Sequence, residues 1–209
     1  MRKKKSGKIM LNKTPAHLFS IILALLFISA CSVTQQGAGG DYGSKEPVHS
    51  TAYKNALSAM KNSEFKKAQS LLQDVINQQP NSSNAHVNLG IVHLKKNSLS
   101  EAENSFNHAL RVNPNNVYAL NQLGILYRQL GNFSAAKSYY EKAIDINSDY
   151  ANAHLNLGVL YDLYLYDFPN AIEQYKIYQS LTKNKNKQVE KWIIDLERRL
   201  KKSLESKSK

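Results

Sequence analysis

Histidines are the side chains in this sequence whose spacing comes nearest to a metal site. His86 and His93 lie seven residues apart in a stretch with helical periodicity, so both point to the same face. At 1.5 Å of rise per residue, about 10.5 Å of helix axis separates them. One metal ion cannot bridge that distance without a third ligand. We therefore interpret both histidines as packing residues and predict no metal site.

No catalytic motif accompanies these histidines. The sequence has no nucleophile motif, no glycine-rich phosphate loop and no metal-ligand spacing. Glu101 and Glu103 lie at the start of an expected helix, where acidic side chains interact favourably with the helix dipole. They therefore need no catalytic role. We predict that the protein is not an enzyme and has no cofactor.

The single cysteine, Cys31, lies where a leader segment would end. Residues 1–17 hold six basic residues and no acidic one, and residues 18–30 are almost wholly apolar. The apolar run is too short to span a bilayer comfortably and has the layout of a secretory signal. Because there is no second cysteine, no internal disulfide can form.

The sequence ISAC, which ends at Cys31, resembles the lipobox of bacterial lipoproteins. That resemblance implies a signal peptide over residues 1–30 and acyl chains such as palmitate on Cys31, which becomes the mature N-terminus. A plain signal peptide with a chance cysteine, or an ordinary buried thiol, is the alternative. Ser32 stands where an aspartate often retains lipoproteins in the inner membrane, so the resemblance implies an outer-membrane anchor facing the periplasm. Residues 31–48 are rich in glycine and predict a flexible tether.

The net charge of +12 comes from the two ends of the chain. The six basic residues before Cys31 account for half of it. Residues 182–209 account for the other half, with ten basic and four acidic side chains. The middle of the chain is close to neutral, and a neutral surface binds phosphates poorly. We predict that the protein binds no nucleic acid.

The strongest pattern in the sequence is a Leu-Gly pair that returns every 34 residues. The pairs are Leu89-Gly90, Leu123-Gly124 and Leu157-Gly158. Alanines such as Ala102 and Ala136 follow at a fixed distance, and apolar residues recur at helical spacing in both halves of each period. Each period therefore predicts two helices that cross closely where their small residues face each other.

This pattern resembles the tetratricopeptide repeat, which has the same period. The resemblance implies an all-α solenoid over residues 49–182. Its four expected helix-turn-helix units are residues 49–82, 83–116, 117–150 and 151–182. The first unit has Ala56 in place of the glycine, and the middle alanine of the fourth, Ala171, comes one residue late. We place the extra residue in the turn over 164–170. A generic helical bundle with an accidental period is the alternative.

Residues 183–209 predict a basic amphipathic capping helix and tail. Five apolar residues recur there at helical spacing: Val189, Trp192, Ile193, Leu196 and Leu200. Because a solenoid needs its last repeat covered, we expect this face to pack on the fourth unit. Contact of the basic face with anionic lipid or an acidic partner is the other interpretation, and the two can coexist.

In tetratricopeptide proteins the first helices of successive units line a concave groove, so the resemblance implies a peptide-binding groove here. Carried over by position, the candidate residues are Tyr53, Leu57, Asn84, Val87, Ile91, Lys95, Tyr118, Asn121, Ile125, Arg128, Asn152, Leu155 and Val159. The asparagines could bind a peptide backbone, and the tyrosines could anchor side chains. Packing between helices is the alternative role for the apolar members.

The chain is similar to periplasm-facing tetratricopeptide lipoproteins of Gram-negative bacteria. That similarity implies an adaptor that binds a segment of another envelope protein and assists a pilus and secretin complex or a TonB-type system. A regulator that positions peptidoglycan synthases or hydrolases is the alternative. The implied partners are an envelope protein or peptide and, through Cys31, the membrane.

Overall fold

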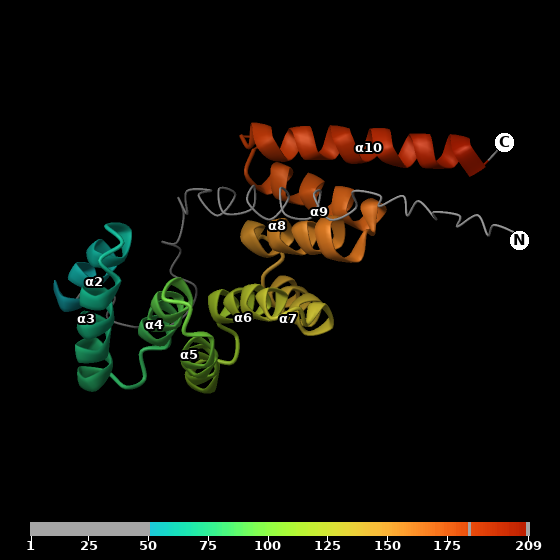
Figure 1. Ribbon diagram of the computed structural model, residues 1–209. Helices are drawn as coiled ribbons and strands as arrows, with labels where there is room; N and C mark the ends of the chain where they lie inside the picture. The colour runs from blue at the N-terminus through green and yellow to red at the C-terminus, as the bar shows by residue number, and fades with distance from the viewer. Residues whose placement is uncertain (1–50, 184, 208–209) are drawn as a thin grey trace, which may run out of the picture. The chain divides into compact units, whose positions relative to one another are not determined.

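The computed structural model describes residues 51–183 and 185–207, and every regular element within these ranges is helical (Figure 1). The elements are α2 (Thr51–Lys61), α3 (Phe65–Gln78), α4 (Ser83–Lys95), α5 (Leu99–Val112), α6 (Val117–Gln129), α7 (Phe133–Ile146), α8 (Ala151–Leu160), the π-helix η2 (Tyr161–Leu165), α9 (Phe168–Leu181) and α10 (Lys187–Lys207). The predicted signal peptide (1–30), Cys31 and the tether (31–48) lie outside the described residues.

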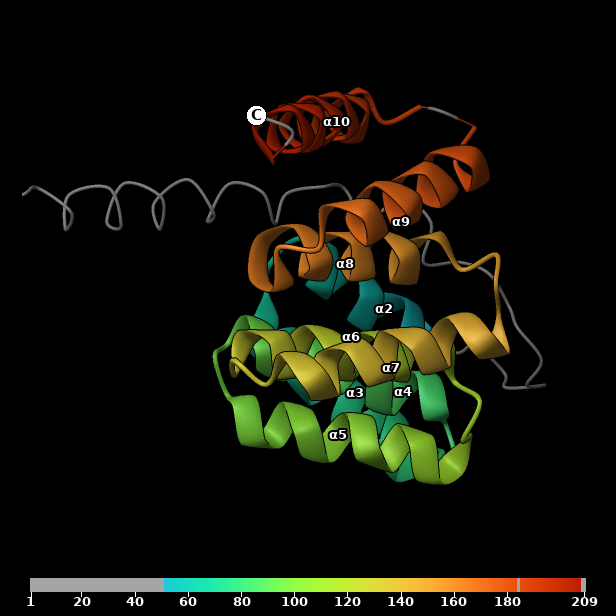
Figure 2. The ribbon, with the colours of Figure 1, turned by 90° about the vertical axis from the view of Figure 1, so that its right-hand side faces the viewer.

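The helices pair as hairpins in chain order, α2 with α3, α4 with α5, α6 with α7 and α8 with α9. Each hairpin packs on the next, and the first helices α4, α6 and α8 contact one another in series. Figure 2 shows α10 lying over α9 at the end of the stack, where the two helices are in contact. The described part of the chain therefore has the predicted architecture, four helical hairpins followed by a terminal helix.

Polar side chains cap the first turn of several helices. The Ser82 hydroxyl accepts a hydrogen bond from the Ala85 amide (3.3 Å), and the Asn116 carbonyl oxygen accepts one from the Ala119 amide (3.0 Å). Such caps satisfy amide groups that have no partner inside the helix. At the other end of the unit, α5 ends at Val112, two residues before Pro114, which cannot continue a helix.

One residue in the turn of each hairpin adopts a left-handed backbone conformation. These residues are Ser63 (φ 60°), Asn97 (φ 59°), Gly131 (φ 77°) and Tyr166 (φ 55°). Glycine and asparagine adopt this conformation readily, whereas a tyrosine does so at a cost. The first three follow the 34-residue period, and the fourth comes one residue later.

The fourth hairpin accommodates its extra residue in η2. The helix widens there to a π-helix, whose turns hold more residues than those of an α-helix. The expected place, the turn over 164–170, is therefore only partly correct, because η2 begins earlier, at Tyr161. After η2, Asp167 caps α9 by accepting a hydrogen bond from the Asn170 amide (3.3 Å), and Pro169 lies in the first turn of α9.

The glycine of each Leu-Gly pair lies against an aromatic ring on the second helix of its hairpin. A Cβ atom on Gly90 would come closer than 3.0 Å to the ring of Phe106, and the same holds for Gly124 with Tyr140. In the fourth hairpin, Gly158 faces Tyr175 in the same way, despite the extra residue between them. Because these rings are buried, the position admits no side chain while the ring stays in place.

The first hairpin has a different pair at the same two positions. Ala56 replaces the glycine and Leu72 replaces the aromatic residue, and both are fully buried in one cluster. A larger first residue thus accompanies a smaller second one. The irregularity that the sequence shows at Ala56 is therefore matched across the helix interface, and total volume is roughly maintained.

The terminal helix α10 covers the fourth hairpin as predicted. Val189 and Leu196 are buried in the same cluster as Tyr175 and Tyr178 of α9, with Trp192 packed against it. The rings of Tyr175 and Trp192 lie 5.5 Å apart. The sequence placed a large residue, Tyr178, where the second and third units have alanine. The structure explains this, because Tyr178 packs on the cap rather than on a following repeat.

Candidate functional site

The predicted groove residues all lie on the first helices of the hairpins, α2, α4, α6 and α8. Their exposure differs. Tyr53, Val87 and Asn121 are buried, whereas Leu57, Lys95 and Asn152 are exposed. The remaining candidates are half-buried: Asn84, Ile91, Tyr118, Ile125, Arg128, Leu155 and Val159. A partner that lies along these helices could therefore contact the exposed and half-buried members directly.

Two of the buried candidates join neighbouring repeats. The Asn88 amide donates a hydrogen bond to the Tyr53 hydroxyl (2.6 Å), and the Asn156 amide donates one to the Asn121 carbonyl oxygen (2.9 Å). The structure thus gives Tyr53 and Asn121 partners within the chain. Their contact with a peptide stays a prediction. Their hydrogen bonds hold neighbouring first helices together beneath the candidate surface.

Asn84, Tyr118 and Asn152 lie nearer to solvent. Asn84 accepts a hydrogen bond from the Asn116 amide (3.3 Å) across the junction between the second and third hairpins. The Tyr118 ring meets the ring of Tyr150 edge-on, at 5.3 Å between centroids. Asn152 is exposed at the start of α8. These residues therefore offer amide and aromatic groups close to the points where repeats meet.

Arg128 connects α6 with the turn of the fourth hairpin. Its guanidinium lies 5.8 Å from the centre of the Tyr164 ring, a cation–π contact. Tyr164 also packs against Phe133, at 4.9 Å between ring centres. Lys95, by contrast, is exposed in the last turn of α4, where a positive charge interacts favourably with the helix dipole. The two basic candidates thus have different surroundings.

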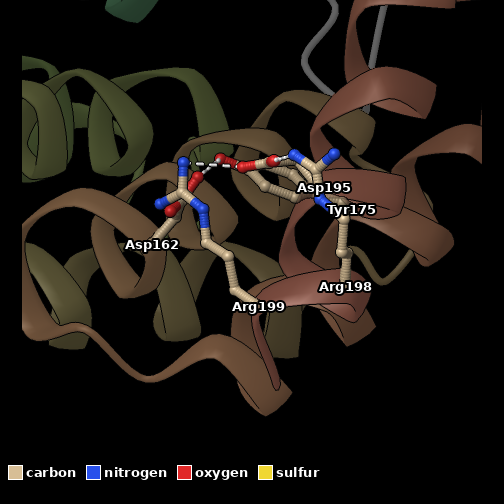
Figure 3. A network of polar contacts seen from close by, with 5 residues as sticks. All are labelled: Asp162, Tyr175, Asp195, Arg198 and Arg199. Carbon is tan, nitrogen blue, oxygen red and sulfur yellow. Dashed lines mark hydrogen bonds and ion pairs between the residues drawn. The ribbon is translucent and has the colours of Figure 1, made fainter. Parts of the chain in front are cut away.

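Two sets of polar contacts that sequence reasoning missed lie side by side where α10 meets the fourth hairpin (Figure 3). Asp195 on α10 pairs with Arg198 and with Arg199 (2.6 Å to the latter). On the hairpin, the Tyr175 hydroxyl donates a hydrogen bond to the Asp162 carboxylate (3.3 Å). Burial raises the pKa of the Asp162 carboxyl, whereas the bond from Tyr175 and the charge of Arg199 act in the opposite direction. Only the folded chain reveals this arrangement, because Asp162 and Asp195 are distant in sequence.

His86 and His154 have structural partners, whereas Nδ1 of His93 is buried without a hydrogen-bond partner among the described residues. The His86 ring bonds through Nε2 to the Pro80 carbonyl (3.0 Å) and stacks on His108, at 4.0 Å between centroids. His154, two periods later, bonds through Nε2 to the Ser148 carbonyl (2.9 Å). Among the described residues, no three His, Cys, Asp or Glu side chains come together as metal ligands would. Over the same ranges, none of the helices has the length and apolar character that crossing a membrane requires.

Comparison with known protein families identifies the repeats. One tetratricopeptide-repeat model matches residues 59–123 and another matches residues 117–150. Together they cover the second and third hairpins and part of the first. These residues are therefore tetratricopeptide repeats, and the all-α solenoid predicted from the 34-residue period is confirmed. No curated protein sequence matches the chain.

Solved structures of the same fold share little sequence with this chain. The structure of pilF from Pseudomonas aeruginosa matches with a TM-score of 0.66 at 18% identity, over 75% of this chain and 71% of that one. A MamA structure matches with a TM-score of 0.55 at 20% identity, over 75% of this chain and 90% of that one. The first tetratricopeptide domain of Spaghetti (RPAP3), bound to an HSP90 peptide, matches with a TM-score of 0.52 at 19% identity. The match covers 56% of this chain and 92% of that one. At these identities the likeness concerns the fold alone.

Proposed function

We propose that this tetratricopeptide-repeat solenoid is an adaptor of the bacterial envelope, which holds a segment of another protein against its first helices. Tetratricopeptide proteins mediate protein–protein interaction, and the Spaghetti domain is bound to a peptide in its solved structure. The observation that carries the proposal here is the series of contacts between α4, α6 and α8, whose candidate residues remain partly exposed.

The chemistry of these helices favours an extended segment with mixed apolar and polar side chains. Ile91, Ile125 and Val159 occupy the same place in successive repeats and are half-buried, so they offer a repeated apolar contact. Asn84 and Asn152 can add hydrogen bonds to a peptide backbone. The small number of charged candidates makes a strongly acidic segment a poor fit to this surface.

The location in this proposal comes from the N-terminal sequence. We propose that Cys31 carries the lipid anchor and that the repeats face the periplasm from the outer membrane. Several buried acyl chains anchor a protein stably, at about 0.8 kcal/mol per methylene. The partner would then be a component of an envelope complex, such as a pilus and secretin assembly or a TonB-type system. The fold shared with Pseudomonas aeruginosa pilF is compatible with the former.

Site-specific photo-crosslinking in the native envelope tests the binding surface. A photo-reactive amino acid is placed at Leu57, Lys95 or Asn152, which are exposed candidate positions. Matched control sites are Gln73 and Ser138, which are exposed on the second helices α3 and α7. We expect the three candidate positions to crosslink to one common envelope protein and the control positions not to do so. Equal crosslinking from both sets would contradict the proposed surface.

The anchor has a separate test, so that the two parts of the proposal can fail independently. Cells grown with labelled palmitate should incorporate the label into the wild-type chain and not into Cys31→Ser. Separation of inner and outer membranes then shows where the labelled protein resides. Absence of label from the wild-type chain, or label only in the inner membrane, would overturn the proposed location and leave the crosslinking result standing.

A further inference from the structure

Two neighbouring positions in each hairpin carry a different pair of side chains from repeat to repeat. The first lies on the first helix, four residues after the glycine or, in the first hairpin, after Ala56. The second is the ring position on the second helix, which Leu72 occupies in the first hairpin. Residues four apart lie on the same side of a helix, so the first position is one turn from the point where the ring packs. The pairs are Met60 with Leu72, Leu94 with Phe106, Arg128 with Tyr140, and Asp162 with Tyr175.

Three of these four pairs are chemically matched. In the first and second hairpins both members are apolar and belong to one cluster. In the fourth, the Tyr175 hydroxyl donates a hydrogen bond to the Asp162 carboxylate (Figure 3). In the third, the Arg128 guanidinium can only donate, and the buried Tyr140 hydroxyl has no hydrogen-bond partner among the described residues. The third hairpin therefore lacks the acceptor that Asp162 supplies in the fourth.

Arg128 is held in position but is not neutralised. Its guanidinium lies over the ring of Tyr164, which packs on Phe133, and it forms no ion pair with any residue in the described part of the chain. Burial raises the pKa of the Tyr140 hydroxyl, whereas the nearby positive charge of Arg128 acts in the opposite direction. The hydroxyl therefore stays protonated at neutral pH, so that two donors lie near each other without an acceptor.

Acidic side chains around this pair are engaged elsewhere. The Asp162 carboxylate accepts from Tyr175, and the cation that acts on its pKa, against the effect of burial, is Arg199 of α10. On α7, Glu141 pairs with Lys137 at 3.6 Å. These carboxylates therefore leave Arg128 and Tyr140 without an acceptor.

We propose that Arg128 and Tyr140 bind one carboxylate of the protein segment that lies along the first helices. The half-buried guanidinium donates to it directly. The Tyr140 hydroxyl donates to the same group when the Tyr164 ring, which is 38% exposed, turns aside. This inference rests on the proposed peptide-binding function and specifies one side chain of the bound segment. A single acidic residue agrees with the small number of basic candidates on this surface.

The carboxylate belongs to an Asp or Glu within the segment and not to its C-terminus. Candidate residues continue on both sides of α6, with Ile91 on α4 and Val159 on α8, and these three first helices contact one another in series. A segment that follows the series passes Arg128 and does not end there. Leu130, two residues after Arg128, is 50% exposed and offers an apolar contact beside the charge. We therefore expect an apolar residue next to the acidic one.

Side-chain NMR of the full chain carrying Cys31→Ser, labelled with ¹⁵N, tests the site. The probes are three capped peptides: acetyl-Leu-Glu-Leu amide has an internal carboxylate, acetyl-Leu-Gln-Leu acid has a terminal one, and acetyl-Leu-Gln-Leu amide has none. The Nε–Hε resonance of Arg128 is identified by its absence in Arg128→Gln. We expect the first peptide to shift this resonance and to bind about tenfold more tightly than the other two.

Two tyrosine variants separate binding from folding. Tyr140→Phe removes the hydroxyl without a partner, so it should weaken binding of acetyl-Leu-Glu-Leu amide about fivefold without lowering stability. Tyr175→Phe removes a hydroxyl that is already bonded to Asp162, so it should lower stability and leave binding unchanged. A purely structural role of Tyr140 would not produce this opposite pattern.

Two arginine variants test the charge. Arg128→Gln should abolish the preference for the Glu peptide over the Gln amide. The matched control, Arg111→Gln, removes the same charge from an exposed position on the second helix α5 and should leave the preference unchanged.

The outcomes distinguish this inference from the proposed function. Equal binding of the three peptides, or unchanged binding in Tyr140→Phe, would overturn the carboxylate site. If the side-chain amides of Asn84 and Asn152 still shift with every peptide, the proposed function stands. Tighter binding of acetyl-Leu-Gln-Leu acid than of the Glu peptide would overturn the assignment to an internal residue. No shift at any candidate residue with any peptide would overturn both proposals.

Discussion

The first hairpin and the three that follow pack the same helix crossing with different pairs of side chains. In the second, third and fourth hairpins a glycine faces an aromatic ring, whereas in the first Ala56 is paired with Leu72. The comparison shows that the repeat does not require glycine as such. It requires that the two facing residues together fill the space between the helices, and several pairs can do so.

Among the variants that test this comparison, removal of a ring should lower the free energy of unfolding most. Phe106 is fully buried, so Phe106→Ala leaves a cavity that the surrounding helices fill only partly. We expect a loss of about 3–5 kcal/mol in the free energy of unfolding, measured by urea denaturation followed by circular dichroism. Asn104→Ala, exposed on the same helix, should be nearly neutral. A loss below about 1 kcal/mol for Phe106→Ala would mean that the ring does not fill this space.

Addition of a methyl group to the glycine should have the next largest effect. In Gly90→Ala the new Cβ collides with the Phe106 ring, so we expect a loss of about 1–3 kcal/mol. The loss should appear although alanine has the higher helix propensity. In the first hairpin the opposite change, Ala56→Gly, should cost about 1 kcal/mol.

The double variant Gly90→Ala with Phe106→Leu transplants the pair of the first hairpin into the second. The cycle also needs the single variant Phe106→Leu. If the two positions share one space, the double variant should lose about 1–2 kcal/mol less free energy of unfolding than the two single variants lose together. Strict additivity in this cycle would show that the two pairs are unrelated and would break the comparison.

The smallest expected effect concerns the tyrosine hydroxyls at the ring position. Tyr140 has a buried hydroxyl with no hydrogen-bond partner among the described residues, whereas Tyr175 donates to Asp162. We expect Tyr140→Phe to raise the free energy of unfolding by about 1 kcal/mol, because an unsatisfied polar group is no longer buried. Tyr175→Phe should lower it by a similar amount. The same denaturation assay checks both, and a loss in Tyr140→Phe would point to a bond that bridging water supplies.

Much of the candidate surface follows from the period. The assignment of Tyr53, Asn121 and Asn152 to the first helices is correct, because equal positions in successive repeats fall on equivalent helices. Their exposure could not be predicted in the same way. Tyr53 and Asn121 are buried where neighbouring repeats meet, and they accept hydrogen bonds from Asn88 and Asn156. Each donor lies 35 residues further along the chain, in the next repeat.

The end of the stack shows the same division. Apolar residues at helical spacing predicted that α10 would cover the last repeat, since an amphipathic helix must bury its apolar face. The sequence did not predict how the helix is held there. Asp162 comes close to Asp195 and Arg199 only because α10 packs on α9 of the fourth hairpin.

The sequence by itself determined the number of repeats, the helical character of each half and the position of the cap, because these depend on local periodicity and on side-chain size. The tertiary structure decided which ring each glycine faces, that the extra residue of the fourth repeat widens a helix at Tyr161, and which apolar side chains of α10 remain exposed. The physical reason is that a close contact between two elements depends on the shape and charge of both, and a repeat pattern specifies each element separately.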